Sequence, residues 1–175
     1  MIYPASLRQL LNGNSKIFIT DDSWMQHAIQ LAQEGQKQGE VPVGALLVQH
    51  GKVLAAAYNT PILDKDPTSH AEINVIRKAA QSLNNYRILD STLYVTLEPC
   101  CMCAGAIIQA RISRVVFGAF DKKAGACGSV FNMLAAPEVN HHPEVLGGVL
   151  QEACSSMLTK FFQAKRLTRI TQCCD

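Results

Sequence analysis

The sequence predicts an α/β domain of three layers, in which helices cover both faces of a mixed central sheet of about five strands. Two patterns carry this prediction. Residues 43–58 have the pattern of a hairpin, which indicates antiparallel pairing. Residues 92–119 have a strand–helix–strand pattern, which indicates a right-handed crossover and parallel pairing. The chain has 175 residues, of which 48% are hydrophobic and 17% charged, as expected of one compact core.

The first half of the chain reads as a helix followed by the hairpin. Asp21–Ser23 are residue types that begin helices, and Gly39 is a plausible end. The apolar run Val43–Val48 predicts a strand buried on both faces, and 53–58 returns as the second strand. Residues 59–68 contain two prolines and are predicted to form a loop.

The second half alternates between helix and strand. The predicted helices are 70–83, 100–110 and 150–168, and the predicted strands are 92–97 and 114–119. Pro99 ends a strand, and the glycines within 123–129 indicate a loop. The short apolar run Val145–Val149 fits either a strand or the start of a helix. The domain is therefore predicted to span 21–170, with an N-terminal extension at 1–20 and a tail at 171–175.

Composition also limits the compartment and the partners. The N-terminus lacks a secretory pattern, and no run approaches the roughly 18 apolar residues that span a bilayer, so no membrane association and a cytoplasmic location are expected. Net charge is +2, so an anionic partner must meet a local basic patch. Seven cysteines, three of them within 100–103, indicate a metal site in a reducing compartment better than a disulfide framework.

Two short motifs are predicted to share that metal. One is His70-Ala71-Glu72, and the other is Pro99 followed by Cys100 and Cys103. The i, i+3 spacing at a helix start puts both sulfurs on one face, where the helix dipole favours thiolates. His70, Cys100 and Cys103 would leave the fourth position of a tetrahedral zinc ion open to water, which is typical of catalytic zinc sites.

Glu72 is predicted to be the catalytic residue and not a ligand. Two residues after His70, its carboxylate can take a proton from zinc-bound water and return protons to the reacting base and the leaving amine. Alone, the histidine would fit a helix cap, and a C-x-x-C pair would fit a structural or redox role. A structural zinc would need a fourth ligand such as Cys101, but that residue points about 100° away around the helix, so we expect a small, buried or half-buried side chain.

These motifs and the segments around them resemble the cytidine-deaminase-like superfamily of zinc enzymes and, within it, the bacterial tRNA-specific adenosine deaminases. The resemblance runs from about Trp24 to Arg166, and 118–129 and Phe161-Phe162 are more particular to the tRNA enzymes. It implies hydrolytic deamination of adenosine to inosine at the wobble position of a tRNA anticodon, with one Zn²⁺ per subunit, the tRNA anticodon stem-loop as partner, and a homodimer.

The same resemblance implies a set of substrate-binding residues. Val41 would help wall the pocket, and Asn59 would contact the flipped nucleoside. Asp121 and Asn140 would meet the ribose or neighbouring nucleotides. Phe162 would lie against the bound loop. Packing is the alternative for at least one of Phe161 and Phe162, and a turn role is the alternative for Asn59. Relatives often carry a basic or polar residue at the position of Phe120, and some have arginine at that of Thr60. Residues 1–20 have no counterpart that can be placed.

The end of the last helix is predicted to meet RNA phosphates. Four basic residues lie within ten positions beside aromatic side chains: Lys160, Lys165, Arg166 and Arg169. A solvated helix face is the alternative. Two other functions also fit the metal motif: deamination of a free nucleobase or nucleotide (guanine, cytosine or dCMP), and a non-catalytic zinc module that binds RNA or a partner.

Overall fold

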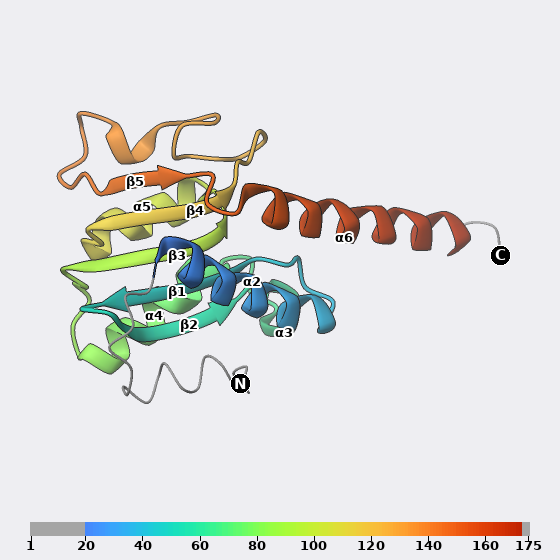
Figure 1. Cartoon of the computed structure of the whole chain (residues 1–175), viewed down its shortest axis with the longest axis horizontal. Helices are drawn as coiled ribbons and strands as arrows, with labels where there is room; N and C mark the ends of the chain where they lie inside the picture. Colours follow the sequence, from blue (N-terminus) through green and yellow to red (C-terminus); the bar gives the residue numbers. More distant parts are fainter. Residues whose placement is uncertain (1–19, 173–175) are drawn as a thin grey trace.

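The predicted three-layer α/β class is confirmed. The computed structural model describes residues 20–172, with side chains up to residue 167, and its five strands form one sheet in the order β2-β1-β3-β4-β5 (Figure 1). The strands are β1 (Gly44–Gln49), β2 (Lys52–Tyr58), β3 (Ser91–Leu97), β4 (Arg114–Ala119) and β5 (Glu144–Gly147). β1 pairs antiparallel with β2 and β3, and β4 pairs parallel with β3 and β5, so the sheet is mixed.

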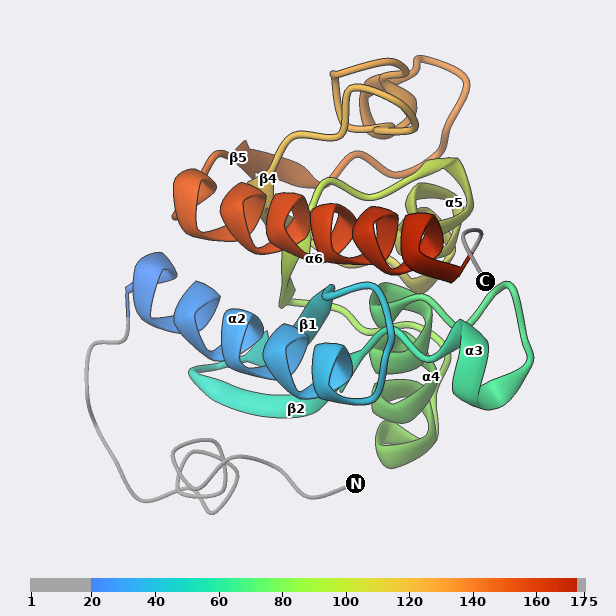
Figure 2. The ribbon, with the colours of Figure 1, turned by 90° about the vertical axis from the view of Figure 1, so that its right-hand side faces the viewer.

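Helices cover both faces of this sheet. They are α2 (Asp21–Lys37), α3 (Pro61–Asp64), α4 (Ala71–Leu83), α5 (Cys101–Ala110) and α6 (Gln151–Gln172), with a short 3₁₀ helix η1 (Met133–Ala135). α2 and α6 lie side by side on one face, and α4 and α5 cover the other (Figure 2). Within the described residues, no helix has the length and apolar character needed to cross a membrane.

The strands β1 to β4 are mostly buried on both faces, which explains their nearly continuous apolar runs, whereas β5 is exposed. In β1, Ala45 and Leu47 pack toward α4 and α5, whereas Leu46 and Val48 pack toward α2. α6 approaches β4 so closely that a Cβ on Gly118 would lie 2.4 Å from the Cys154 sulfur. Only a residue without a side chain allows this contact.

The structure corrects two local predictions and decides a third. α2 is capped by Thr20, whose Oγ1 accepts a hydrogen bond of 3.3 Å from the Ser23 backbone N–H, so Asp21–Ser23 form the first turn instead of the cap. The predicted loop 59–68 contains α3, which is stabilised because the buried Glu40 carboxylate accepts hydrogen bonds from the backbone N–H groups of Ile62 and Leu63. The first three residues of the ambiguous run 145–149 belong to the edge strand β5, Glu144–Gly147.

The features that matter for function lie at one end of the sheet, at the carboxyl ends of its parallel strands. β3, β4 and β5 all end there, and α4 and α5 begin there. The first part of α6 packs against β4, and the helix then extends beyond this end of the sheet (Figure 1). The predicted extension up to residue 19, the Arg169 side chain, and Cys173 and Cys174 lie outside the described residues and side chains.

Candidate metal centre and active site

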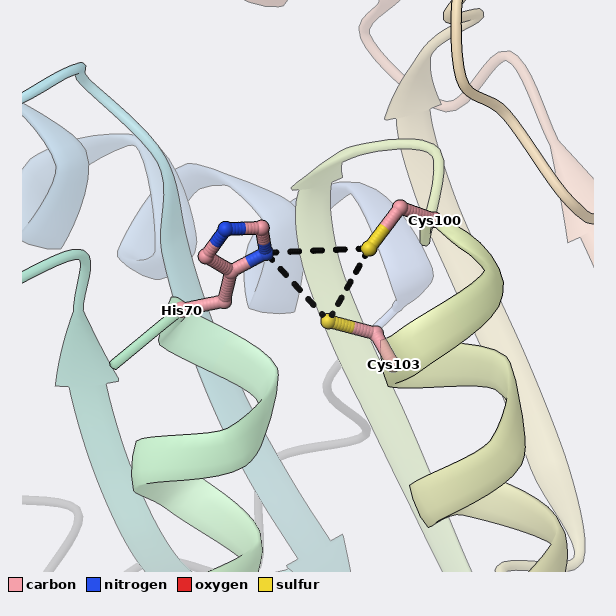
Figure 3. A group of neighbouring side chains, drawn as sticks. All are labelled: His70, Cys100 and Cys103. Carbon is pink, nitrogen blue, oxygen red and sulfur yellow. Dashed lines mark hydrogen bonds between the residues drawn. The ribbon is translucent and has the colours of Figure 1, made fainter. Parts of the chain in front are cut away.

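Three side chains from two helix starts converge on one point. His70 immediately precedes α4, Cys100 immediately precedes α5, and Cys103 lies in the first turn of α5. His70 Nδ1 is 3.7 Å from Cys100 Sγ and 3.5 Å from Cys103 Sγ, and the two sulfurs are 3.7 Å apart (Figure 3). One imidazole and two thiols at this spacing could hold a single metal ion.

Hydrogen bonds within the cluster shift the pKa values of the two cysteines in opposite directions. Hydrogen bonding to Cys103 lowers the pKa of Cys100 to about 3, against the effect of its partial burial, and His70 adds to the lowering. Hydrogen bonding to Cys100, burial and the nearby Glu72 raise the pKa of Cys103. The pKa of His70 is raised chiefly by its hydrogen bond to Cys100. A divalent cation that binds these side chains displaces the protons of the thiols.

Glu72 lies beside the three donors but outside their set. It occupies the first turn of α4 and is only 4% exposed. Burial raises the pKa of its carboxyl group, which is also within electrostatic range of His70 and Cys100. A buried carboxyl group next to a metal-binding cluster has the position required of a proton-transfer group.

The loop before α4 fixes the position of His70. Asn59 Oδ1 accepts a hydrogen bond of 2.8 Å from the Ala71 backbone N–H, directly after His70. Asn74 Nδ2 lies 2.8 Å from Thr60 Oγ1 and 3.2 Å from each of the Tyr58 and Ser69 carbonyl oxygens. This role of Asn74 was not predicted from the sequence, although an asparagine inside a helix is a weak signal for such a tertiary role.

The predicted substrate residues divide into two groups. The segments that carry Val41 and Asn59 meet next to the site, since the Asn59 N–H donates to the Val43 carbonyl and the Val43 N–H to that of Val41. Asp121 lies beside the cysteine motif, because its backbone N–H donates to the Glu98 carboxylate.

Asn140 is not brought to the site. Its carbonyl oxygen accepts a hydrogen bond of 2.6 Å from Arg111, which caps the end of α5 opposite to Cys100. Ten helical residues separate the two ends by about 15 Å. Asn140 therefore lies at the end of the sheet where β4 and β5 begin, and the metal-ligand cluster lies at the end where these strands finish.

The aromatic pair on α6 also divides. Phe161 is 8% exposed and packs edge-on against Phe162 at 5.4 Å, whereas Phe162 is 46% exposed. Packing thus accounts for Phe161, while Phe162 presents a free surface on the helix that leaves the sheet beside the site. Cys101 is half-buried and packs against the core, as expected for a residue outside the ligand set.

The fold and this His–Cys–Cys centre with its adjacent glutamate are those of a nucleoside-deaminase-like enzyme. Residues 19–166 match the model of the MafB19-like deaminases, and the chain belongs to that family.

The chain is similar to deaminases that act on tRNA and to one that acts on guanine. A tRNA-specific adenosine deaminase of Haemophilus influenzae is 50% identical over 147 residues, which cover 83% of this chain and 85% of that protein. A structure from a study of A-to-I editing by tRNA:A34 deaminases at the wobble position of transfer RNA is 41% identical, with a TM-score of 0.75 over 77% of this chain and 98% of that one. A guanine deaminase of Bacillus subtilis is 32% identical, with a TM-score of 0.57 over 84% and 94%.

Proposed function

We propose that this protein is a zinc-dependent hydrolase that converts adenosine to inosine at the wobble position of a tRNA anticodon. The observation that carries the proposal is the cluster of His70, Cys100 and Cys103 with the buried Glu72 beside it. The identity of 50% with a tRNA-specific adenosine deaminase supports the choice of substrate.

The donor separations fit a tetrahedral zinc ion. Zinc bonds of about 2.3 Å to sulfur and about 2.0–2.1 Å to nitrogen separate tetrahedral ligand atoms by about 3.8 Å between sulfurs and about 3.5 Å between sulfur and nitrogen. The cluster has 3.7 Å between its sulfurs, and 3.5 and 3.7 Å between nitrogen and sulfur. No rearrangement of these side chains is needed, and three protein ligands are typical of a catalytic site.

Bound zinc would lower the pKa of water at its open position to about 7 and so supply a nucleophile at neutral pH. Glu72 would take the proton from this water and deliver protons to the adenine ring nitrogen and to the leaving amine. Its burial keeps bulk water from competing for these protons. A purely structural zinc site would have no use for a buried acid at this position.

Asn59 has a second function in this proposal. Its Oδ1 is occupied by the Ala71 N–H, which leaves the Nδ2 group as a donor for the flipped nucleoside. Val41 would wall the pocket, and Asp121 would meet the ribose or a neighbouring nucleotide. Asn140 is omitted from the pocket because its backbone carbonyl oxygen accepts a hydrogen bond from Arg111, at the other end of α5.

The surface beside the site suits a polynucleotide better than a free base. A cavity of about 650 Å³ lies between the 120–129 loop and α6, and its lining combines an aromatic ring with polar and cationic groups: Phe120, Lys122, Ser129, Gln151 and Ser155. Phe120 is 47% exposed and available for base stacking. Lys160, Lys165 and Arg166 are exposed on α6, which extends past the end of the sheet that carries the site. These residues could contact phosphates, and Phe162 would lie against the bound loop.

Two further properties follow from the family relationship as proposals. The enzyme would act as a homodimer with one zinc ion per subunit, and it would work in the cytoplasm, where tRNA is available. Sedimentation of the purified protein tests the first of these.

The guanine deaminase at 32% identity makes deamination of a free purine base the second candidate. The zinc-loaded protein should therefore be incubated separately with total tRNA, free nucleosides and free guanine. We expect inosine in the nuclease digest of the tRNA and no conversion of the small molecules. Conversion of guanine without inosine in tRNA would replace the proposed function with the second candidate.

A further inference from the structure

One buried carboxylate beside the metal-ligand cluster has no role in the proton transfers. Glu98 follows β3 and precedes Pro99 and Cys100, and it is 2% exposed. No lysine or arginine forms an ion pair with it in the described part of the chain. A charge in such a position is costly unless hydrogen bonds compensate it fully.

The compensation comes entirely from one loop. Oε1 accepts hydrogen bonds of 3.0 Å from the backbone N–H groups of Cys127 and Ser129. Oε2 accepts one of 3.0 Å from the Asp121 N–H and a further one from the Ser129 hydroxyl group. These four neutral donors lie 23 to 31 residues from Glu98 in sequence, so the carboxylate joins two distant segments.

The same two segments are also paired through their backbones. The Ala126 N–H donates to the Pro99 carbonyl oxygen at 2.8 Å, and Cys100 and Gly125 form an isolated antiparallel bridge. A Cβ on Gly125 would lie 2.5 Å from the Glu98 carboxyl carbon, so the loop can approach this closely only with glycine there. The loop therefore forms a backing layer for the turn that carries Cys100.

We propose that Glu98 is a positioning residue that fixes the metal ligand Cys100 by fastening the 121–129 loop against the Pro99–Cys100 turn. This inference rests on the proposed zinc site and adds a residue that acts on a ligand without touching metal or substrate. Outer residues that orient ligands typically account for 10–100-fold in metal affinity. The same contacts hold the backbone of Asp121, a predicted substrate residue.

The chemistry of the pocket makes the charge itself necessary. Glutamine in place of Glu98 would keep one acceptor oxygen but turn an amide N–H₂ group toward two of the four donors. Glu98→Gln thus disrupts the clamp with almost no change in volume. Ser129→Ala removes only the hydroxyl contact and is a milder variant. Glu152→Gln makes the same chemical change at an exposed position of α6 and is the matched control.

The test measures metal release from the folded, zinc-loaded protein, well below its unfolding temperature, with a chromophoric chelator in excess. We expect zinc to leave Glu98→Gln about 10–100-fold faster than wild type, Ser129→Ala about 2–5-fold faster, and Glu152→Gln at the wild-type rate. In the cobalt-substituted proteins, the thiolate-to-cobalt absorption should shift in Glu98→Gln alone or most strongly.

A wild-type release rate and an unchanged cobalt spectrum in folded Glu98→Gln would overturn the inference. If that variant does not fold, Ser129→Ala decides, and a wild-type rate there has the same meaning. Failure of the proposed function is distinguishable, because the release test depends only on the zinc site. A wild-type protein that binds zinc but modifies no tRNA would overturn the proposed substrate and leave this inference standing, whereas a wild-type protein that binds no stoichiometric zinc would overturn both.

Discussion

The side-chain oxygen of Asn59 accepts a hydrogen bond of 2.8 Å from the backbone N–H of Ala71, the residue between His70 and Glu72. One end of this carboxamide therefore holds the start of α4, and in the proposed function the other end would donate to the substrate. The two roles can be separated by substitution.

Asn59→Ala should lose both roles and Asn59→Asp only one. Alanine removes a buried acceptor from a helix start, which should cost about 1–2 kcal/mol of unfolding free energy. Aspartate keeps the acceptor and should lose less stability, but it lacks the Nδ2 donor. Thermal unfolding and kcat/KM should be measured on both variants. Wild-type kcat/KM in Asn59→Asp would remove the amide from substrate recognition.

Glu72→Gln should keep the metal and lose turnover. The side chain fills the same buried space in the first turn of α4 but cannot accept a proton from water. We expect kcat to fall by about 10²–10⁴ with zinc content unchanged. Metal analysis of the purified variant is the control, and substantial remaining activity at full zinc occupancy would exclude Glu72 as the proton-transfer group.

Lys165→Ala and Arg166→Ala should weaken tRNA binding and flatten its salt dependence. Each lost phosphate contact should reduce the slope of log K against log salt concentration by about 0.7. Lys52→Ala is the matched control, because Lys52 is exposed at the start of β2, at the end of the sheet away from the metal-ligand cluster. An unchanged slope in the α6 variants would leave that helix as a solvated face.

Stability at acidic pH should depend on Asp21. Hydrogen bonds from Arg114, at 2.8 and 2.9 Å, lower the pKa of its carboxyl group from the usual 3.8. A lowered folded-state pKa stabilises the protein above the unfolded-state pKa, and this stabilisation is lost as pH falls through the folded-state value. Asp21→Asn should therefore be less stable than wild type at pH 7, and the difference should shrink below about pH 4.

The matched control for this prediction is Asp22→Asn, which removes a carboxylate from the same helical turn at an exposed position. Urea unfolding at several pH values compares the three proteins. A stability difference between Asp21→Asn and wild type that stays constant from pH 7 to pH 3 would contradict the assigned pKa shift.

The sequence was sufficient for features that depend on local spacing. The i, i+3 cysteines at a helix start and the His-x-Glu motif predicted the three clustered donors, and the apolar runs predicted four of the five strands. α3 was missed because its first turn is stabilised by Glu40, more than twenty residues away. Glu98 was missed for the same reason, since its partners come from a distant loop.

Asn140 is the clearest case in which the fold changes an interpretation. Resemblance implied a contact with the ribose or a neighbouring nucleotide, whereas the connection between β4 and β5 places Asn140 at the end of the sheet opposite to the metal-ligand cluster. A motif can indicate which residues accompany an activity, whereas their distance from the reacting atoms depends on connections that sequence spacing does not encode.

In the proposed reaction, the zinc-bound protein deaminates one adenosine at the wobble position of an anticodon loop. The most direct measurement is mass-spectrometric mapping of an anticodon stem-loop RNA after incubation with the enzyme, beside a matched RNA whose adenosine is moved one position along the loop. We expect inosine at the wobble position of the first RNA and almost none in the second. Equal conversion of both RNAs, or conversion of free guanine with neither RNA modified, would contradict the proposed reaction.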